Sequence, residues 1–248
     1  MKKYITFLPL TILLITIQCS SEMEDTDTLV TDETETTEIV SDSNSTDNND
    51  NNNSNSSPSD NETSSFDHKE MLTNWVDNII IPSIIIFDNS LETFKESATT
   101  FVNAPTTETL SNLKEAWLSS FLKWQHVEMF DIGLSEEIFY KNRINLYPTN
   151  VEKIENNIST QNYDLDEPVN FSAQGLNGID YLLFGIGENE NEIISKFSDE
   201  NLNYGKYLTD LVDKMVSLTS EIKLSWSDEY KSSFVSSTDN TASSSINK

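Results

Sequence analysis

From residue 66 onward, apolar residues recur at the three- and four-residue spacing of amphipathic helices, and no run alternates as a β-strand would. This pattern predicts a first long helix over residues 67–102. Pro82 lies inside an apolar run of that helix, and because proline lacks an N–H, we expect a kink or a break there. The apolar positions that define the helix are Leu72, Val76, Ile79, Ile86, Phe94, Ala98 and Phe101.

Capping signals and the same periodicity predict the remaining helices. Thr106 follows a turn and is expected to cap a second helix that reaches about Phe130. A capping box at 149–152 is expected to start a short helix, and further helices are expected at 174–185, 189–197 and about 201–230. Residues 134–148 and 159–173 are expected to be irregular, and residues 232–248 are expected to form a frayed terminus. Three long amphipathic helices with several short ones predict an all-α fold, a helical bundle.

The first 18 residues have the pattern of a secretion signal. Lys2 and Lys3 precede an apolar core at 5–17 that is too short to span a bilayer. This core is followed by Cys19, the only cysteine of the chain, and the arrangement resembles a bacterial lipoprotein signal. We therefore expect a lipid on Cys19 and attachment to a membrane through it; a plain signal peptide with an incidental cysteine is the alternative.

Residues 19–66 are expected to form a disordered tether. They contain 13 acidic residues, no lysine or arginine, and little apolar surface that could offset the entropy of ordering. The early acids Glu22, Glu24 and Asp25 resemble the surface-export signal of lipoproteins from Bacteroidetes, although a plain spacer facing the periplasm would have the same composition. Residues 67–248 still carry a net charge of −16, which argues against binding to nucleic acid.

Two carboxylates fall beside apolar helical stripes and are the candidate functional groups. Asp180 lies about 40° from Leu176 on a helical projection, and Asn177 about 60° further round, so both can face one cleft. Glu128 lies about 40° from Trp124 on the stripe of the second helix. The oxygens of Glu128, Asn177 and Asp180 would suit a hard cation, either a divalent ion or iron. A structural ion pair is the alternative for each acid, and for Glu128 a position beyond the buried part of the helix is a further one.

Several other chemistries are excluded by the motifs that are missing. The sequence has no HExxH helix, no CxxC pair and no GxSxG elbow. A tetrahedral zinc site is poorly supplied by two histidines and one cysteine. His126 lies about 160° round the helix from Glu128 and is expected at the surface.

Three segments, at residues 116–133, 145–158 and 173–185, resemble the imelysin-like family in the family's own order. The resemblance implies an all-helical fold of two bundle-like halves, with a site between them, in bacterial envelope proteins named for a proposed metallopeptidase and implicated in iron uptake. The family hallmark is G-x-H-x-x-E. Here Gly175 matches the glycine, whereas Asn177 replaces the histidine and Asp180 replaces the glutamate.

These departures weaken a peptidase interpretation, since an asparagine has no imidazole nitrogen for a metal. The resemblance also implies that residues 67–248 correspond to the first half of the family fold, with the second half missing. Three hypotheses result. The favoured one is a non-catalytic, lipid-anchored outer-membrane protein that binds a metal and has an envelope iron-transport partner. A metallopeptidase and a structural or adaptor protein are the alternatives.

Overall fold

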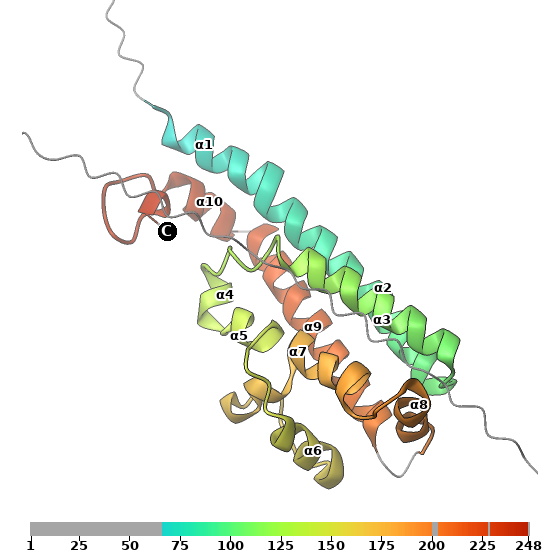
Figure 1. The fold of residues 1–248 in the computed structure, drawn as a ribbon. Helices are drawn as coiled ribbons and strands as arrows, with labels where there is room; N and C mark the ends of the chain where they lie inside the picture. Colours follow the sequence, from blue (N-terminus) through green and yellow to red (C-terminus); the bar gives the residue numbers. More distant parts are fainter. Residues whose placement is uncertain (1–65, 200–202, 228, 248) are drawn as a thin grey trace, which may run out of the picture. The chain divides into compact units, whose positions relative to one another are not determined.

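The computed structural model describes residues 66–199, 203–227 and 229–247, and within these ranges the chain is helical with no strand (Figure 1). The predicted all-α fold is confirmed. The helices are α1 (His68–Trp75), the π-helical turn η1 (Val76–Ile80), α2 (Ile81–Asn103), α3 (Thr107–Trp124), α4 (Leu134–Glu137), α5 (Tyr140–Ile144), α6 (Val151–Thr160), the 3₁₀ turn η2 (Pro168–Ala173), α7 (Gly175–Asp180), the π turn η3 (Tyr181–Gly185), α8 (Glu190–Ser198), α9 (Tyr204–Ser227), α10 (Glu229–Ser236) and the 3₁₀ turn η5 (Ser245–Asn247). The predicted signal peptide, Cys19 and most of the tether lie outside the described residues.

The core of the helical unit is built on α2, which packs against both α3 and α9 (Figure 1). One face of α2 is buried along its length, and burying each large apolar side chain contributes about 1.5–3 kcal/mol. The buried residues of α2 are Ile84, Phe87, Asp88, Leu91, Phe94, Ala98 and Phe101. The continuous helix His68–Asn103 is also long and apolar enough to cross a membrane, but core helices of soluble proteins meet the same criterion. This likeness is therefore weak evidence for a membrane span.

Pro82 does not break this first helix. The irregularity expected there is the π turn η1, in which the N–H of Ile81 bonds the carbonyl of Val76, five residues back. Pro82 is the second residue of α2 and directly follows this turn.

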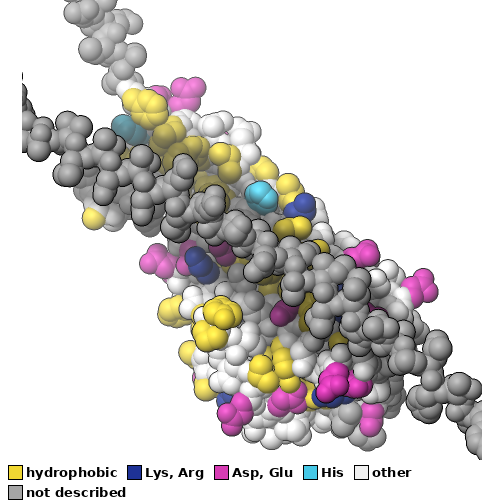
Figure 2. Space-filling view, viewed as in Figure 1, with side chains coloured by type: hydrophobic (Ala, Val, Ile, Leu, Met, Phe, Trp, Pro, Cys, Tyr) yellow, Lys and Arg dark blue, Asp and Glu magenta, His cyan; other side chains and the backbone are white. Residues whose placement is uncertain are grey.

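The π turn also decides which residues of this helix face the core. The buried positions Leu72, Val76, Ile80 and Ile84 are each four residues apart, a spacing that drifts round a regular α-helix but stays aligned where the helix is underwound. Ile79 and Ile86, which the sequence pattern places on the core face, are instead 46% and 51% exposed. Figure 2 shows the resulting row of hydrophobic side chains along α1 and the start of α2.

Polar contacts tie the long helices together within the core. Asp88 of α2 is only 4% exposed, and its carboxylate is bonded by Lys223 and, at 3.1 Å, by the hydroxyl of Ser220, both from α9. The hydroxyls of Tyr140 and Thr219 lie 2.7 Å apart and join α5 to α9. A buried carboxylate that lost its cation would be strongly destabilising, so these contacts fix the register of α9 against its neighbours.

The C-terminal residues are packed, and the expectation of a frayed terminus from residue 232 is wrong. Phe234 of α10 is buried against Trp226 and Tyr230, with ring centres 5.4 and 6.1 Å away. Ser244 and Ser245 are buried as well. The serine-rich composition concealed this because the segment has few apolar side chains that pack on the core, namely Phe234, Val235 and Ile246.

The intervals at 134–148 and 159–173, expected to be irregular, contain α4, α5 and the 3₁₀ turn η2. Each is at most six residues long, too short for helical periodicity to be visible in the sequence.

Candidate functional site

The candidate site is built around the start of α7, where a glycine allows two helices to approach closely. Gly175 has a φ of +72°, and a Cβ atom at this position would lie 2.3 Å from the carbonyl oxygen of Ile144 in α5. Only glycine adopts this backbone conformation without strain and also leaves room for that carbonyl. The glycine of the sequence motif therefore has a structural role, which is to bring α7 against the end of α5.

The close approach fixes the side chain of Asn177. Its Nδ2 donates to Oδ1 of Asn145 at 2.8 Å and to the carbonyl of Leu146 at 3.1 Å. Both amide hydrogens are thereby used, since the amide group has only two. The Oδ1 atom of Asn177 keeps its capacity to accept hydrogen bonds.

Asp180 follows one turn later and is partly buried. Among the described residues, its carboxylate has neither a hydrogen-bond donor nor a cation as a partner. Burial raises the pKa of Asp180 above the ordinary value of an aspartate, because removal from water disfavours the charged form. Since helical side chains lean toward the N-terminus, this carboxylate lies over the turn that carries Leu176 and Asn177.

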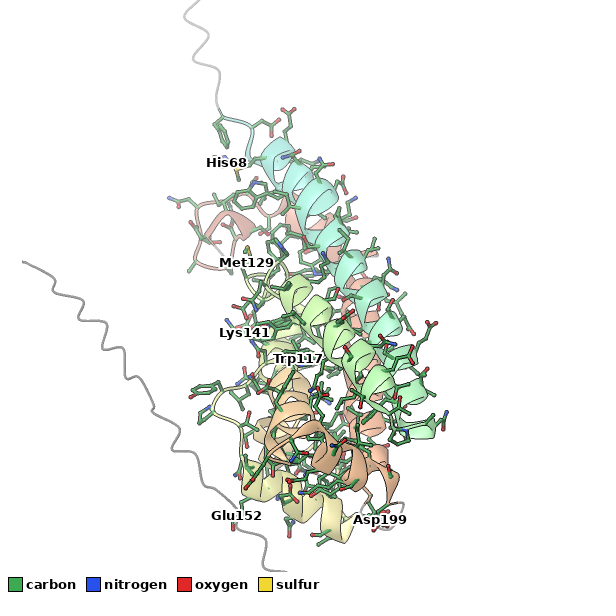
Figure 3. The ribbon with its side chains drawn as sticks, turned by 45° about the vertical axis from the view of Figure 1, so that its right-hand side comes forward. His68, Trp117, Met129, Lys141, Glu152 and Asp199 are labelled. Carbon is green, nitrogen blue, oxygen red and sulfur yellow. The ribbon has the colours of Figure 1, made fainter. Side chains whose placement is uncertain are left out.

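Aromatic side chains lie against the helical segment that carries Asp180. The indole Nε1 of Trp117, labelled in Figure 3, donates to the carbonyl of Leu176 at 3.0 Å. The Trp117 ring also meets that of Phe184 edge to face, with centres 5.5 Å apart. Phe184 follows Asp180 by four residues and is 47% exposed. We refer to Asn177, Asp180, Phe184 and Trp117 as the Asp180 face.

One cation of the protein already lies beside this face. Nζ of Lys114 is 4.9 Å from the centre of the Phe184 ring and 2.9 Å from a carboxylate oxygen of Glu190. Lys114 is therefore neutralised by its own partner, and it leaves Asp180 without a counter-charge.

Glu128 lies in a different setting from the one expected. α3 ends at Trp124, and the chain continues in tight turns, with the N–H of Val127 bonding Trp124 at 2.8 Å and that of Phe130 bonding Val127 at 2.9 Å. The expected helix end at Phe130 is thus too late by about two turns. Glu128 accepts a hydrogen bond of 2.9 Å from the buried indole of Trp124. His126 is exposed, as predicted.

The structure gives no direct support to a metal site at these residues. No hydrogen bond or ion pair joins Glu128 to Asn177 or Asp180, although all three belong to the described part of the chain. Within the same residues, no group of three or more His, Cys, Asp or Glu side chains could hold a metal ion. Asp180 and Asn177 alone fall short of the six to eight oxygens that calcium prefers. The three-residue metal site remains a prediction, and these donors by themselves do not fit a metal.

A concave region of about 620 Å³ lies between residues 163–165 and α9, but most of the charged side chains that line it are paired with neighbouring residues. Asp210 is bonded by Lys206 and by the hydroxyl of Tyr163, and Asp213 is paired with Lys95. We therefore place the candidate site at Asp180, where an acid is left without a partner.

Sequence reasoning found Asn177 and Asp180 but missed Trp117, Phe184 and Asn145. The apolar pattern assigns Trp117 to the core stripe of the second helix. Its indole N–H was the available signal, because a tryptophan near the surface of a stripe still needs an acceptor.

Comparison with known proteins gives one family and two related folds. The family model for imelysin, peptidase M75, matches residues 86–248. A solved protein of Parabacteroides distasonis ATCC 8503, described as an iron-regulated protein A precursor, is 18% identical with a TM-score of 0.54; the match covers 64% of this chain and 45% of that one. A solved imelysin-like protein of Psychrobacter arcticum 273-4 is 17% identical with a TM-score of 0.55, covering 73% and 55%. The chain thus spans about half the length of both solved proteins. No curated protein matches it.

Proposed function

This chain belongs to the imelysin family, and on that premise we propose that it is a non-catalytic, lipid-anchored binding protein of the cell envelope with a role linked to iron. The observation that carries the binding role is Asp180, a partly buried carboxylate without a partner among the described residues. An unpaired acid of this kind is stabilised when a positively charged ligand binds beside it. The acidic surface of the helical unit would attract such a ligand.

The non-catalytic part of the proposal is supported by the chemistry of the motif. Asn177 uses its amide hydrogens on Asn145 and Leu146 and cannot act as a general base. The family name includes a peptidase, but the described residues offer no three-ligand acidic or histidine cluster that could activate water.

The envelope location and the anchor are supported by the sequence, in which a basic start and a short apolar core precede Cys19. The link to iron is supported by the name of one solved relative, which describes that protein as iron-regulated.

The anchor is tested by isolating the protein from bacterial membranes and measuring its intact mass. Processing at Cys19 should give a mature chain with added acyl groups, and Cys19→Ser should remain unacylated and leave the outer-membrane fraction. Recovery of the wild-type protein as a soluble chain with an unmodified Cys19 would refute the anchor.

The binding role is tested by thermal unfolding of the mature chain with a panel of cations. The panel contains Fe²⁺, Fe³⁺, Ca²⁺, Zn²⁺ and short peptides bearing lysine or arginine. At least one member should raise the unfolding temperature of the wild type and not that of Asp180→Asn. Glu152→Gln, which removes an exposed acid on α6, is the matched control and should respond as the wild type does (Figure 3).

Two outcomes would redirect the proposal. Chelator-sensitive cleavage of casein that is lost in Asp180→Asn would establish a peptidase. If no cation distinguishes the wild type from Asp180→Asn, the acid has only a structural role, as an adaptor protein would require.

A further inference from the structure

The Asp180 face presents hydrogen-bond acceptors and no free donor. The two oxygens of Asp180 are without partners, and Asn177 has only Oδ1 left, because its Nδ2 is held by Asn145 and Leu146. The indole N–H of Trp117 is likewise used, by the carbonyl of Leu176. Any ligand that binds here must therefore bring the donors as well as the positive charge.

The number of oxygens argues against a bare metal ion. A hard divalent cation takes six to eight oxygens, and zinc takes four ligands of which most are nitrogen or sulfur. The face supplies one carboxylate and one amide oxygen, and no three-ligand acidic or histidine cluster occurs elsewhere in the described residues.

The same groups match a guanidinium ion well. A guanidinium is planar, carries five N–H donors, and can bond both oxygens of one carboxylate at once. It also lies favourably against aromatic rings, and nearly half of the Phe184 side chain is open to solvent. Lys114 already shows that this ring accepts a cation nearby, and the pairing of Lys114 with Glu190 limits its repulsion of a second one.

We propose that the Asp180 face binds an arginine side chain of a protein partner. The guanidinium donates two hydrogen bonds to Asp180 and one to Oδ1 of Asn177, and it rests against the exposed part of Phe184. This inference rests on the proposed binding function and specifies its ligand. The net negative charge of the helical unit favours encounter with such a basic partner.

The test uses the indole N–H of Trp117 as a local reporter in ¹⁵N NMR spectra of the mature chain carrying Cys19→Ser. That proton bonds Leu176, one turn before Asp180, and its signal is assigned by its loss in Trp117→Phe. The probes are blocked arginine, blocked lysine, blocked citrulline as an uncharged arginine analogue, Ca²⁺ and Zn²⁺. Blocked arginine should shift the Trp117 signal saturably, with a Kd on the order of millimolar, as expected for one side chain binding alone.

The variants separate the contributions of charge and ring. Asp180→Asn should weaken arginine binding at least tenfold, and Phe184→Leu about threefold, whereas Glu152→Gln should leave it unchanged. Because Phe184 is half exposed, its substitution leaves the core intact, so this variant keeps the test valid if Asp180→Asn folds poorly. Lysine should bind about threefold more weakly than arginine, and citrulline should cause no saturable shift.

The outcomes distinguish this inference from the function on which it rests. If Ca²⁺ or Zn²⁺ shifts Trp117 in a manner lost in Asp180→Asn while arginine does not, the arginine ligand is overturned and the binding function stands. An equal response to citrulline would overturn recognition by charge. If no cation produces an Asp180-dependent shift, both fail.

Discussion

Gly175→Ala tests whether the close approach of α7 to α5 holds the candidate site together. The new methyl group would lie 2.3 Å from the carbonyl oxygen of Ile144 and 2.7 Å from that of Arg143, and both obstacles are backbone atoms that cannot rotate away. The substitution also forces an L-residue into left-handed backbone geometry, which costs about 1–2 kcal/mol. Relief of the clash moves α7 away from α5.

That movement would also break the two hydrogen bonds of Asn177, each contributing about 1 kcal/mol. We therefore expect Gly175→Ala to lower the free energy of unfolding by about 3–4 kcal/mol. For a domain of this size the unfolding temperature should fall by about 10 °C. The measurements are urea denaturation and thermal unfolding followed by circular dichroism.

Gly205→Ala is the matched control. This glycine lies in α9, and the atom nearest to the added methyl group would be the Cγ1 of Val102 at 2.9 Å, a side-chain atom and not a backbone carbonyl. The gain in helix propensity of about 1 kcal/mol offsets that adjustment, so the change should stay within about 1 kcal/mol of the wild type. If Gly175→Ala were as mild as Gly205→Ala, the packing account of the motif glycine would be wrong.

Three further substitutions test the electrostatics and the packed C-terminus. Asp180→Asn should be more stable than the wild type at pH 7, because burial raises the pKa of Asp180 and ionisation then opposes folding; the difference should vanish as the pH falls below about 4, which denaturation at several pH values would show. Asp166→Ala should cost about 1 kcal/mol at neutral pH, after allowance for the exposure of this carboxylate, since it removes the acid that pairs with the buried Arg143. Lys214 and Arg143 lower the pKa of Asp166, so that loss should persist above about pH 4 and disappear as the pH falls through the lowered pKa. Phe234→Ala should cost about 3 kcal/mol in urea denaturation, whereas Phe66→Ala, at an exposed position, should change stability little; equal effects would contradict the packing of α10.

The long helices could be predicted from the sequence because their apolar stripes repeat over many turns. The predicted positions of the helix ends were less accurate. The stripe of the second helix continues through Val127 and Phe130, but the chain winds there in three-residue turns that the pattern does not reveal. Phe234 was missed although it continues the four-residue spacing of Trp226 and Tyr230, because the serine-rich composition around it is typical of a frayed tail.

Only the part of the candidate site that depends on local helix geometry could be predicted from the sequence. Asn177 and Asp180 are three residues apart, and helix geometry alone places them on one side. The contacts of Asn177 with Asn145 and of Trp117 with Leu176 span 32 and 59 residues, and no local pattern encodes such pairs. Glu128, in contrast, accepts a hydrogen bond from Trp124, only four residues before it, and a four-residue spacing along a helix is compatible with such a contact.

The π turn before Pro82 constrains the number of residues in this segment more tightly than it constrains which residues they are. Substitutions within residues 76–80 leave the count of backbone units unchanged, and the underwound turn can persist. Deleting one residue there would convert the turn into regular helix and would leave Leu72 on the core side, because a π-helical turn holds one residue more than an α-helical turn. The ring of Pro82 would then press on the carbonyl of the residue four positions before it. Over evolutionary time, the extra residue of this turn should therefore be retained together with Pro82.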